Sequence, residues 1–76
     1  MDYYVIKCKN GYPPANKYTI TNYGYRKHDL PYTFRDCIRY SENGWVTILN
    51  NRYFVCIADD PAEAMTKFWM EYMYNK

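Results

Sequence analysis

The part of the chain that most restricts its fold is a pair of short strands near the C-terminus. Residues 45–49 and 52–58 are rich in β-branched and aromatic side chains, which favour strands. Asn50 and Asn51 lie between the two runs, and asparagine tolerates the left-handed conformations that a tight hairpin turn requires. We therefore expect a β-hairpin here.

A helix start follows the hairpin directly. Asp59 or Asp60 is a good N-cap, Pro61 is favoured at the first helical position, and acidic groups suit the positive end of the helix dipole. The pattern predicts a helix over 60–74 that packs on the hairpin. Its expected apolar stripe is Ala62, Met65, Trp69, Tyr72 and Met73, with Phe68 at the edge and Glu63, Lys67 and Glu71 opposite.

The N-terminal part predicts one strand clearly. Residues 3–8 (YYVIKC) are short, aromatic and β-branched, and Asn10-Gly11 marks a turn after them. A further strand over 17–21 is an additional expectation. The polar stretch 21–29 has no apolar periodicity and is interpreted as an exposed loop.

Residues 31–42 (PYTFRDCIRYSE) fit two structures. In a helix, Leu30, Phe34, Cys37, Ile38 and Ser41 share one face, and Pro31 and Gly44 bracket the segment as helix boundaries often do. In a strand, Asp36 would lie on the same side as Phe34 and Ile38, and Asn43-Gly44 would be a hairpin turn. We favour the helix, and the strand remains the alternative.

The length of 76 residues allows one core, so residues 1–76 are predicted to form a single domain. The predicted fold class is α+β: a small antiparallel sheet of three or four strands with two helices. Sixteen aromatic residues exceed what so small a core can hold, so several of the eleven tyrosines are expected on the surface.

Cysteine usage and hydropathy predict a cytoplasmic protein. Cys8, Cys37 and Cys56 are odd in number and widely spaced within apolar segments, as buried free thiols are. Apolar runs are only a few residues long and Met1 precedes Asp2, so we expect neither a membrane span nor a signal peptide.

The sequence offers no catalytic constellation, so we expect no enzyme, cofactor or metal. Cys8, His28, Cys37 and Cys56 lack the close ligand pairs of structural zinc sites, and a Cys37–His28 nucleophile pair has no oxyanion-hole loop. The adjacent Asp59 and Asp60 are explained by helix capping, and phosphate-binding and hydrolase motifs are missing.

Aromatic rings and cations alternate between residues 18 and 39. This combination suits contact surfaces, since Tyr and Arg dominate protein hot spots and can also stack bases and neutralise phosphates. An ordinary solvated face with two or three core tyrosines would look similar. The candidate binding residues are Tyr18, Tyr23, Tyr25, Arg26, Lys27, Arg35 and Arg39.

The C-terminal stretch GWVTILNNRYFVCIADDPAEAMTKFWMEY resembles the ending of small phage-encoded αβ domains of the ABA-sandwich group, in which a hairpin leads into a D-x-P-A-E-A-like helix start. The resemblance covers about thirty residues and carries over no functional residues. It implies a phage or mobile-element accessory protein, a class that includes inhibitors of host defence enzymes, acting in the host cytoplasm.

The function we expect is a non-catalytic binding module that binds or inhibits a host protein. The alternative is a small nucleic-acid-binding protein using the same Tyr/Arg/Lys-rich surface. The net charge of +2 is compatible with nucleic acid but is well below the clustered charge typical of that class. A structural subunit of a homo-oligomer is a third possibility.

Overall fold

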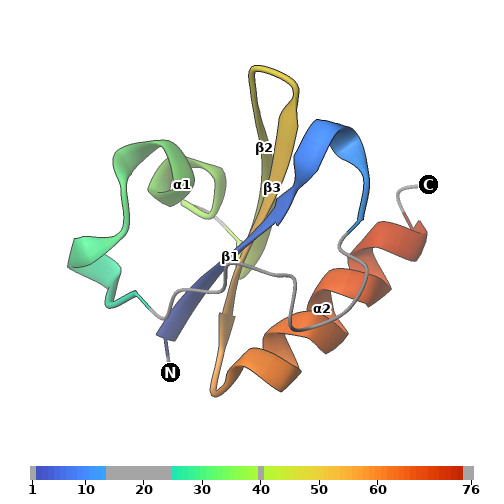
Figure 1. The fold of residues 1–76 in the computed structure, drawn as a ribbon. Helices are drawn as coiled ribbons and strands as arrows, with labels where there is room; N and C mark the ends of the chain where they lie inside the picture. The colour runs from blue at the N-terminus through green and yellow to red at the C-terminus, as the bar shows by residue number, and fades with distance from the viewer. Residues whose placement is uncertain (1, 14–24, 40, 75–76) are drawn as a thin grey trace.

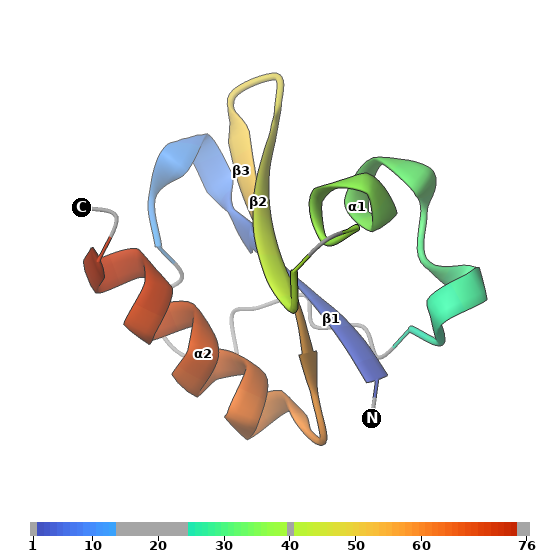
Figure 2. The ribbon, with the colours of Figure 1, turned by 180° about the vertical axis from the view of Figure 1, so that it is seen from behind.

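The computed structural model describes residues 2–13, 25–39 and 41–74, and confirms the α+β class. Figure 1 shows a central sheet with one helix on each side, and the reverse view in Figure 2 agrees. The predicted strand over 17–21 lies outside the described residues. The elements are β1 (Asp2–Cys8), a 3-10 turn (Lys9–Gly11), a second 3-10 turn (Lys27–Asp29), α1 (Tyr32–Cys37), β2 (Asn43–Ile48), β3 (Asn51–Ala58) and α2 (Pro61–Tyr74).

The sheet has three antiparallel strands in the order β1-β3-β2, so β3 is central. Val5 of β1 pairs with Val55, and Trp45 of β2 pairs with Phe54. Because successive strand residues point to opposite faces, Val55 and Phe54 belong to different faces of the sheet. Each face carries its own apolar cluster, one under α1 and the other under α2.

The α2 face holds the larger cluster. Phe54 and Phe68 are fully buried, and their ring centroids lie 5.9 Å apart in an edge-on arrangement. Trp45 packs beside both, with its ring 5.0 Å from Phe54 and 5.8 Å from Phe68. The other members are Tyr4, Ile6 and Cys8 of β1, Cys56 and Ala58 of β3, and Ala64, Met65 and Tyr72 of α2.

The predicted apolar stripe of α2 is only partly right: Met65 and Tyr72 pack in the core as expected, but the other three residues do not, and the helix begins one residue later than predicted. Phe68, expected at the edge of the stripe, is at the centre of the core, whereas Trp69 is 37% exposed. Ala62 and Met73, also expected in the stripe, are exposed. From Ala64 round to Tyr74, the apolar residues of α2 span an arc of about 280° at roughly 100° per residue, which is wider than one sheet face covers. The sequence alone therefore does not determine which part of this arc packs against the sheet.

The start of α2 is as predicted. The Asp60 carboxylate accepts a hydrogen bond from the Glu63 backbone N–H at 2.8 Å, and the Asp60 carbonyl accepts one from Ala64 at 3.1 Å. These bonds satisfy donors that would otherwise lack partners in the first turn. Lys67, expected to point away from the sheet, instead donates from Nζ to the Ile57 carbonyl at 2.6 Å.

The helix expected over 31–42 exists but is much shorter. It ends at Cys37, and β2 begins at Asn43, so the alternative strand over the whole segment is also wrong. A Cβ atom on Gly44 would overlap the Cys37 carbonyl oxygen. Gly44 therefore permits close contact between the end of α1 and β2 and does not cap a longer helix.

The hairpin is confirmed, but its turn lies one residue earlier than predicted. Ile48 pairs with Asn51, which places Leu49 and Asn50 at the turn. Leu49 adopts a left-handed φ of 57° that is unfavourable for a non-glycine residue. The Leu49 side chain is exposed, so packing of this side chain does not fix the turn. The turn position follows the pairing of β2 with β3 and not the preference of asparagine for left-handed conformations.

Candidate functional site

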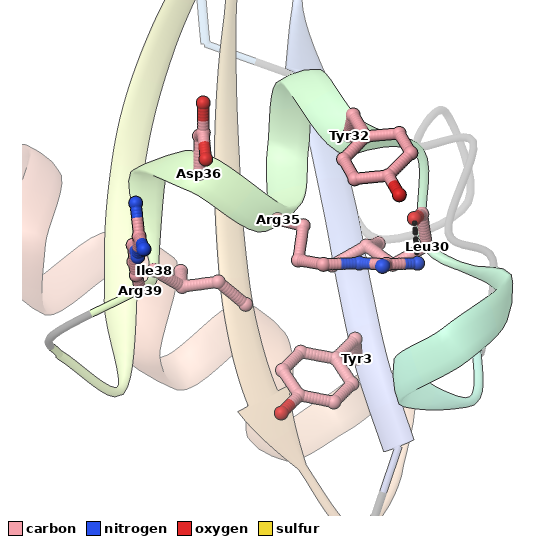
Figure 3. A pocket seen from close by; sticks show the side chains of 7 residues that line it. All are labelled: Tyr3, Leu30, Tyr32, Arg35, Asp36, Ile38 and Arg39. Atoms are coloured by element: carbon pink, nitrogen blue, oxygen red, sulfur yellow. Dashed lines mark hydrogen bonds between the residues drawn. The ribbon is translucent and has the colours of Figure 1, made fainter.

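A pocket of about 410 Å³ lies on the α1 face. Figure 3 shows it between α1, the segment preceding it, and β1. The short α1 covers only part of this sheet face, and none of its own residues is fully buried. The lining residues are Tyr3, Leu30, Tyr32, Arg35, Asp36, Ile38 and Arg39.

Arg35 is the central polar group of the pocket. Its NH2 group donates to the backbone carbonyls of His28 and Leu30, each at 3.0 Å. The guanidinium carbon lies 4.8 Å from the centroid of the Tyr32 ring, within cation–π range. Figure 3 shows the Arg35 side chain passing below Tyr32, with Tyr3 on the opposite side. The guanidinium is therefore held in a defined orientation.

A further donor of Arg35 lacks an acceptor in the described part of the chain. Nε is buried and has no hydrogen-bond partner among these residues. An unsatisfied buried donor costs about 1–3 kcal/mol, more for a charged group. Structures retain such a cost where a functional group is held ready for a ligand, so Arg35 is the strongest candidate binding residue.

The charge of the pocket is positive. Arg35 and Arg39 both line it, and Asp36 is the one carboxylate among the lining residues. Asp36 is exposed, and Figure 3 shows its carboxylate pointing away from Arg35. Among the described residues, the ion pairs are His28–Asp29 and Lys67–Glu63, and neither involves Arg35. The arrangement suits an anionic ligand.

Of the predicted binding residues that the structure describes, Arg35 and Arg39 meet in the pocket, and Tyr25 and Arg26 are not among its lining residues. Arg35 and Arg39 line it, whereas Arg26 is exposed beside the 3-10 turn that contains Lys27. Tyr18 and Tyr23 lie outside the described residues.

Tyr25 is half-buried, which contradicts the exposed loop expected over 21–29. Its backbone exchanges two hydrogen bonds of 2.8 Å with Tyr3, and its ring packs against the cluster of Val5, Leu30 and Val55. An isolated bridge of this kind has no sequence periodicity, so pattern analysis does not detect it. Tyr25 therefore supports the pocket wall at Tyr3.

Five residues that line the pocket were not predicted as site residues from the sequence: Tyr3, Leu30, Tyr32, Asp36 and Ile38. Tyr3 belongs to the predicted strand, and strand alternation puts it on the opposite face from the buried Tyr4. The alternation could therefore have placed Tyr3 on the α1 face. No feature of the neighbouring sequence indicates that α1 ends early and leaves the Tyr3 ring at the edge of a pocket.

The structure does not bring the cysteines and the histidine together. Cys8 and Cys56 are buried on the α2 face, Cys37 packs on the α1 face, and His28 is exposed. Burial raises the pKa of the Cys56 thiol to about 11, with a smaller opposing effect of Lys67. In residues 2–13, 25–39 and 41–74, no cluster of three potential metal ligands exists.

Comparisons with protein-family models, with curated proteins and with solved structures found no match. No helix in the described ranges is long and apolar enough to cross a membrane. Functional inference for this chain therefore rests on the geometry of the pocket.

Proposed function

We propose that this protein is a non-catalytic binding module that recognises a protein partner through the α1-face pocket. The observation that supports the proposal is Arg35, which is held at the pocket by two backbone carbonyls and Tyr32 and whose Nε lacks an acceptor among the described residues. A carboxylate is the natural complement of a guanidinium held in this way. The ligand class is an Asp, Glu or C-terminal carboxylate of a peptide segment.

The shape of the pocket favours protein over nucleic acid. Its volume suits one or two side chains, and its apolar lining by Leu30 and Ile38 suits the aliphatic part of a peptide. Single-stranded nucleic acid is bound along extended basic grooves in which several rings stack on successive bases.

The biological setting we propose follows from the resemblance of the C-terminal stretch to phage ABA-sandwich domains. A phage or mobile-element accessory protein that occupies a surface of a host protein in the host cytoplasm needs a rigid binding site and no catalytic group. The α1-face pocket on a small sheet meets that need.

The test is selection of peptides from a random phage-displayed library on the whole protein, followed by affinity measurement with the selected peptides. We expect enrichment of peptides with an Asp, Glu or free C-terminal carboxylate. Arg35→Met keeps the aliphatic stem and removes the charge, so it should weaken binding by about tenfold or more. Arg35→Lys keeps the positive charge but loses the bidentate geometry of the guanidinium, so its affinity should lie between those of the wild type and Arg35→Met.

Arg52→Met is the matched control, because Arg52 lies on the α2 face with its guanidinium 4.4 Å from the Trp45 ring. It should bind the peptides as wild type does. Thermal melting establishes that each variant is folded. If Arg35→Met does not fold, Arg39→Met serves as the second pocket variant. Selection of peptides that carry no acidic group would contradict the proposal. So would Arg35 and Arg39 variants that bind the selected peptides as tightly as the wild type does.

A labelled single-stranded oligonucleotide tests the alternative in parallel. Nucleic-acid binding would show a steep loss of affinity between about 50 and 200 mM salt, and removal of each contacting cation would flatten that slope by about one unit. We expect no such binding. A salt-dependent complex that requires Arg35, together with failure of peptide selection, would replace the protein partner by nucleic acid.

A further inference from the structure

The exposed side of α2 carries a second apolar surface, distinct from the core and on the opposite face of the sheet from the pocket. Four side chains form it: Trp69, Met70, Met73 and Tyr74, which are 37%, 58%, 64% and 84% exposed. Their spacing of one, four and five residues makes them neighbours over two successive helical turns. We call these four residues the α2 patch.

The α2 patch is anchored on the core. The Trp69 ring lies 5.1 Å from Phe68 and 5.7 Å from Tyr72, edge-on to both. Phe68 is fully buried, so Trp69 is held between the core and the outer surface. A partly buried aromatic ring fixed in this way loses little conformational entropy when a partner covers it, which is typical of hot-spot residues.

The size of the patch is informative. The four exposed fractions amount to roughly 600 Å² of accessible surface, at the upper end of the largest apolar patch on a typical monomer. If a second copy covered the patch of each chain, the two patches together would bury roughly 1,200 Å², which is the lower limit for specific protein–protein interfaces. The area therefore matches a weak dimer.

The exposed side of α2 has small side chains in its first half and large ones in its second half, so two copies of it can fit together. Ala62 and Thr66 lie on the same side of α2 as Trp69 and Met73, but are small. The Thr66 hydroxyl donates to the Ala62 carbonyl at 3.1 Å, so it needs no partner from outside the helix. The exposed stripe is thus small in its first half and large in its second.

We propose that the α2 patch binds a second copy of this chain, with the two α2 helices antiparallel. Antiparallel pairing places the bulky half of each helix over the small half of the other, and it also opposes the two helix dipoles favourably. The contact is isologous, so it closes as a dimer. Both pockets remain accessible, because they lie beside α1, and α1 and α2 are on opposite sides of the sheet (Figures 1 and 2).

Sedimentation equilibrium of the full chain from about 5 to 500 µM tests the dimer. We expect a concentration-dependent monomer–dimer equilibrium with a Kd of roughly 10–100 µM, given the small area. Met70→Glu and Met73→Glu should each weaken it by tenfold or more. Leu49→Asp, which introduces the same charge at an exposed apolar residue on the hairpin turn, should leave the Kd unchanged.

A charge-pair rescue tests the antiparallel arrangement. In that arrangement residue 62 of one copy faces residue 73 of the other, so the double variant Ala62→Lys with Met73→Glu should dimerise more tightly than Met73→Glu alone. In a parallel pair like charges would meet at both sites and the double variant would be weaker still.

A wild-type chain that stays monomeric at the highest concentration overturns the proposal, as does an equal effect of Leu49→Asp. Failure of the rescue overturns the antiparallel pairing. Circular dichroism melting confirms that each variant is folded. Because peptide binding in the pocket is measured separately, failure of the dimer leaves the proposed function intact.

Discussion

The two faces of the sheet differ in how completely they are covered. On the α2 face, a helix of fourteen residues buries Ala64, Met65 and Phe68 against β1 and β3. On the α1 face, a helix of six residues buries none of its own side chains fully and leaves a pocket at Arg35. The α2 face therefore holds the larger part of the buried core, while the α1 face leaves polar side chains open at a pocket.

The sharpest test of this difference is a matched pair of Phe→Ala variants. Phe68→Ala should cost about 3–5 kcal/mol, because a fully buried ring leaves a cavity at the centre of the core. Phe34→Ala should cost about half as much, since that ring is half-buried and contacts Tyr53 at 5.2 Å. Urea unfolding measures both.

Trp69→Ala sharpens the same comparison. Trp69 is partly exposed, so its replacement should cost clearly less than that of Phe68, contrary to the phase expected from the sequence. If Trp69→Ala were the more damaging of the two, α2 would have to be rotated relative to the sheet.

Alkaline pH should act through the α2 face. Burial raises the pKa of Cys56 from an ordinary 9.0 to about 11, so between these values the unfolded chain loses a proton that the folded chain keeps. The free energy of unfolding should then fall as pH rises from 9, by about 1.4 kcal/mol per unit and at most about 3 kcal/mol by pH 11.

Unfolding curves of wild type, Cys56→Ala and Cys37→Ala between pH 8 and 11 check this expectation. Cys56→Ala should flatten the alkaline decline, whereas Cys37→Ala should change it less, because Cys37 is only half-buried although burial also raises its pKa. Identical slopes in wild type and Cys56→Ala would show that the Cys56 thiol is not the group responsible.

Gly44→Ala should weaken the α1 face specifically. The added methyl group would overlap the Cys37 carbonyl and force the end of α1 away from β2, at a cost of about 1–3 kcal/mol. Since Ile38 and Arg39 follow directly and line the pocket, peptide affinity should fall together with the melting temperature. A folded Gly44→Ala protein with wild-type affinity would separate the pocket from this contact.

The smallest expected effect is at the start of α2. Asp60→Ala removes the carboxylate that accepts the Glu63 N–H and should cost about 1 kcal/mol. Asp59→Ala removes the same charge one residue earlier and should cost less. Equal costs, measured by thermal unfolding, would show that the general charge at the helix end matters more than the cap bond. In α1, by contrast, Pro31 occupies the cap position and forms no side-chain cap bond.

Much of the candidate site lay beyond pattern analysis. Arg35 and Arg39 were expected binding residues and both line the pocket, but Tyr3 and Ile38 reach it from segments far apart in the chain. Tyr25 was expected to be exposed because its surroundings lack periodicity, and its pairing with Tyr3 contradicts this. Long-range pairing of a single residue leaves no local signal.

The sequence alone determined the features that depend on neighbouring residues: the strands of the hairpin, the strand 3–8, and the helix start at Asp60-Pro61. Alternation, β-propensity and capping act within a few residues, so they can be recognised locally. Tertiary structure decided which arc of α2 is buried, where α1 ends, and which face of the sheet remains open. The apolar arc of α2 exceeds what one sheet face covers, and α1 is limited by the close approach of Cys37 to Gly44. Both outcomes depend on packing against strands that are distant in the sequence.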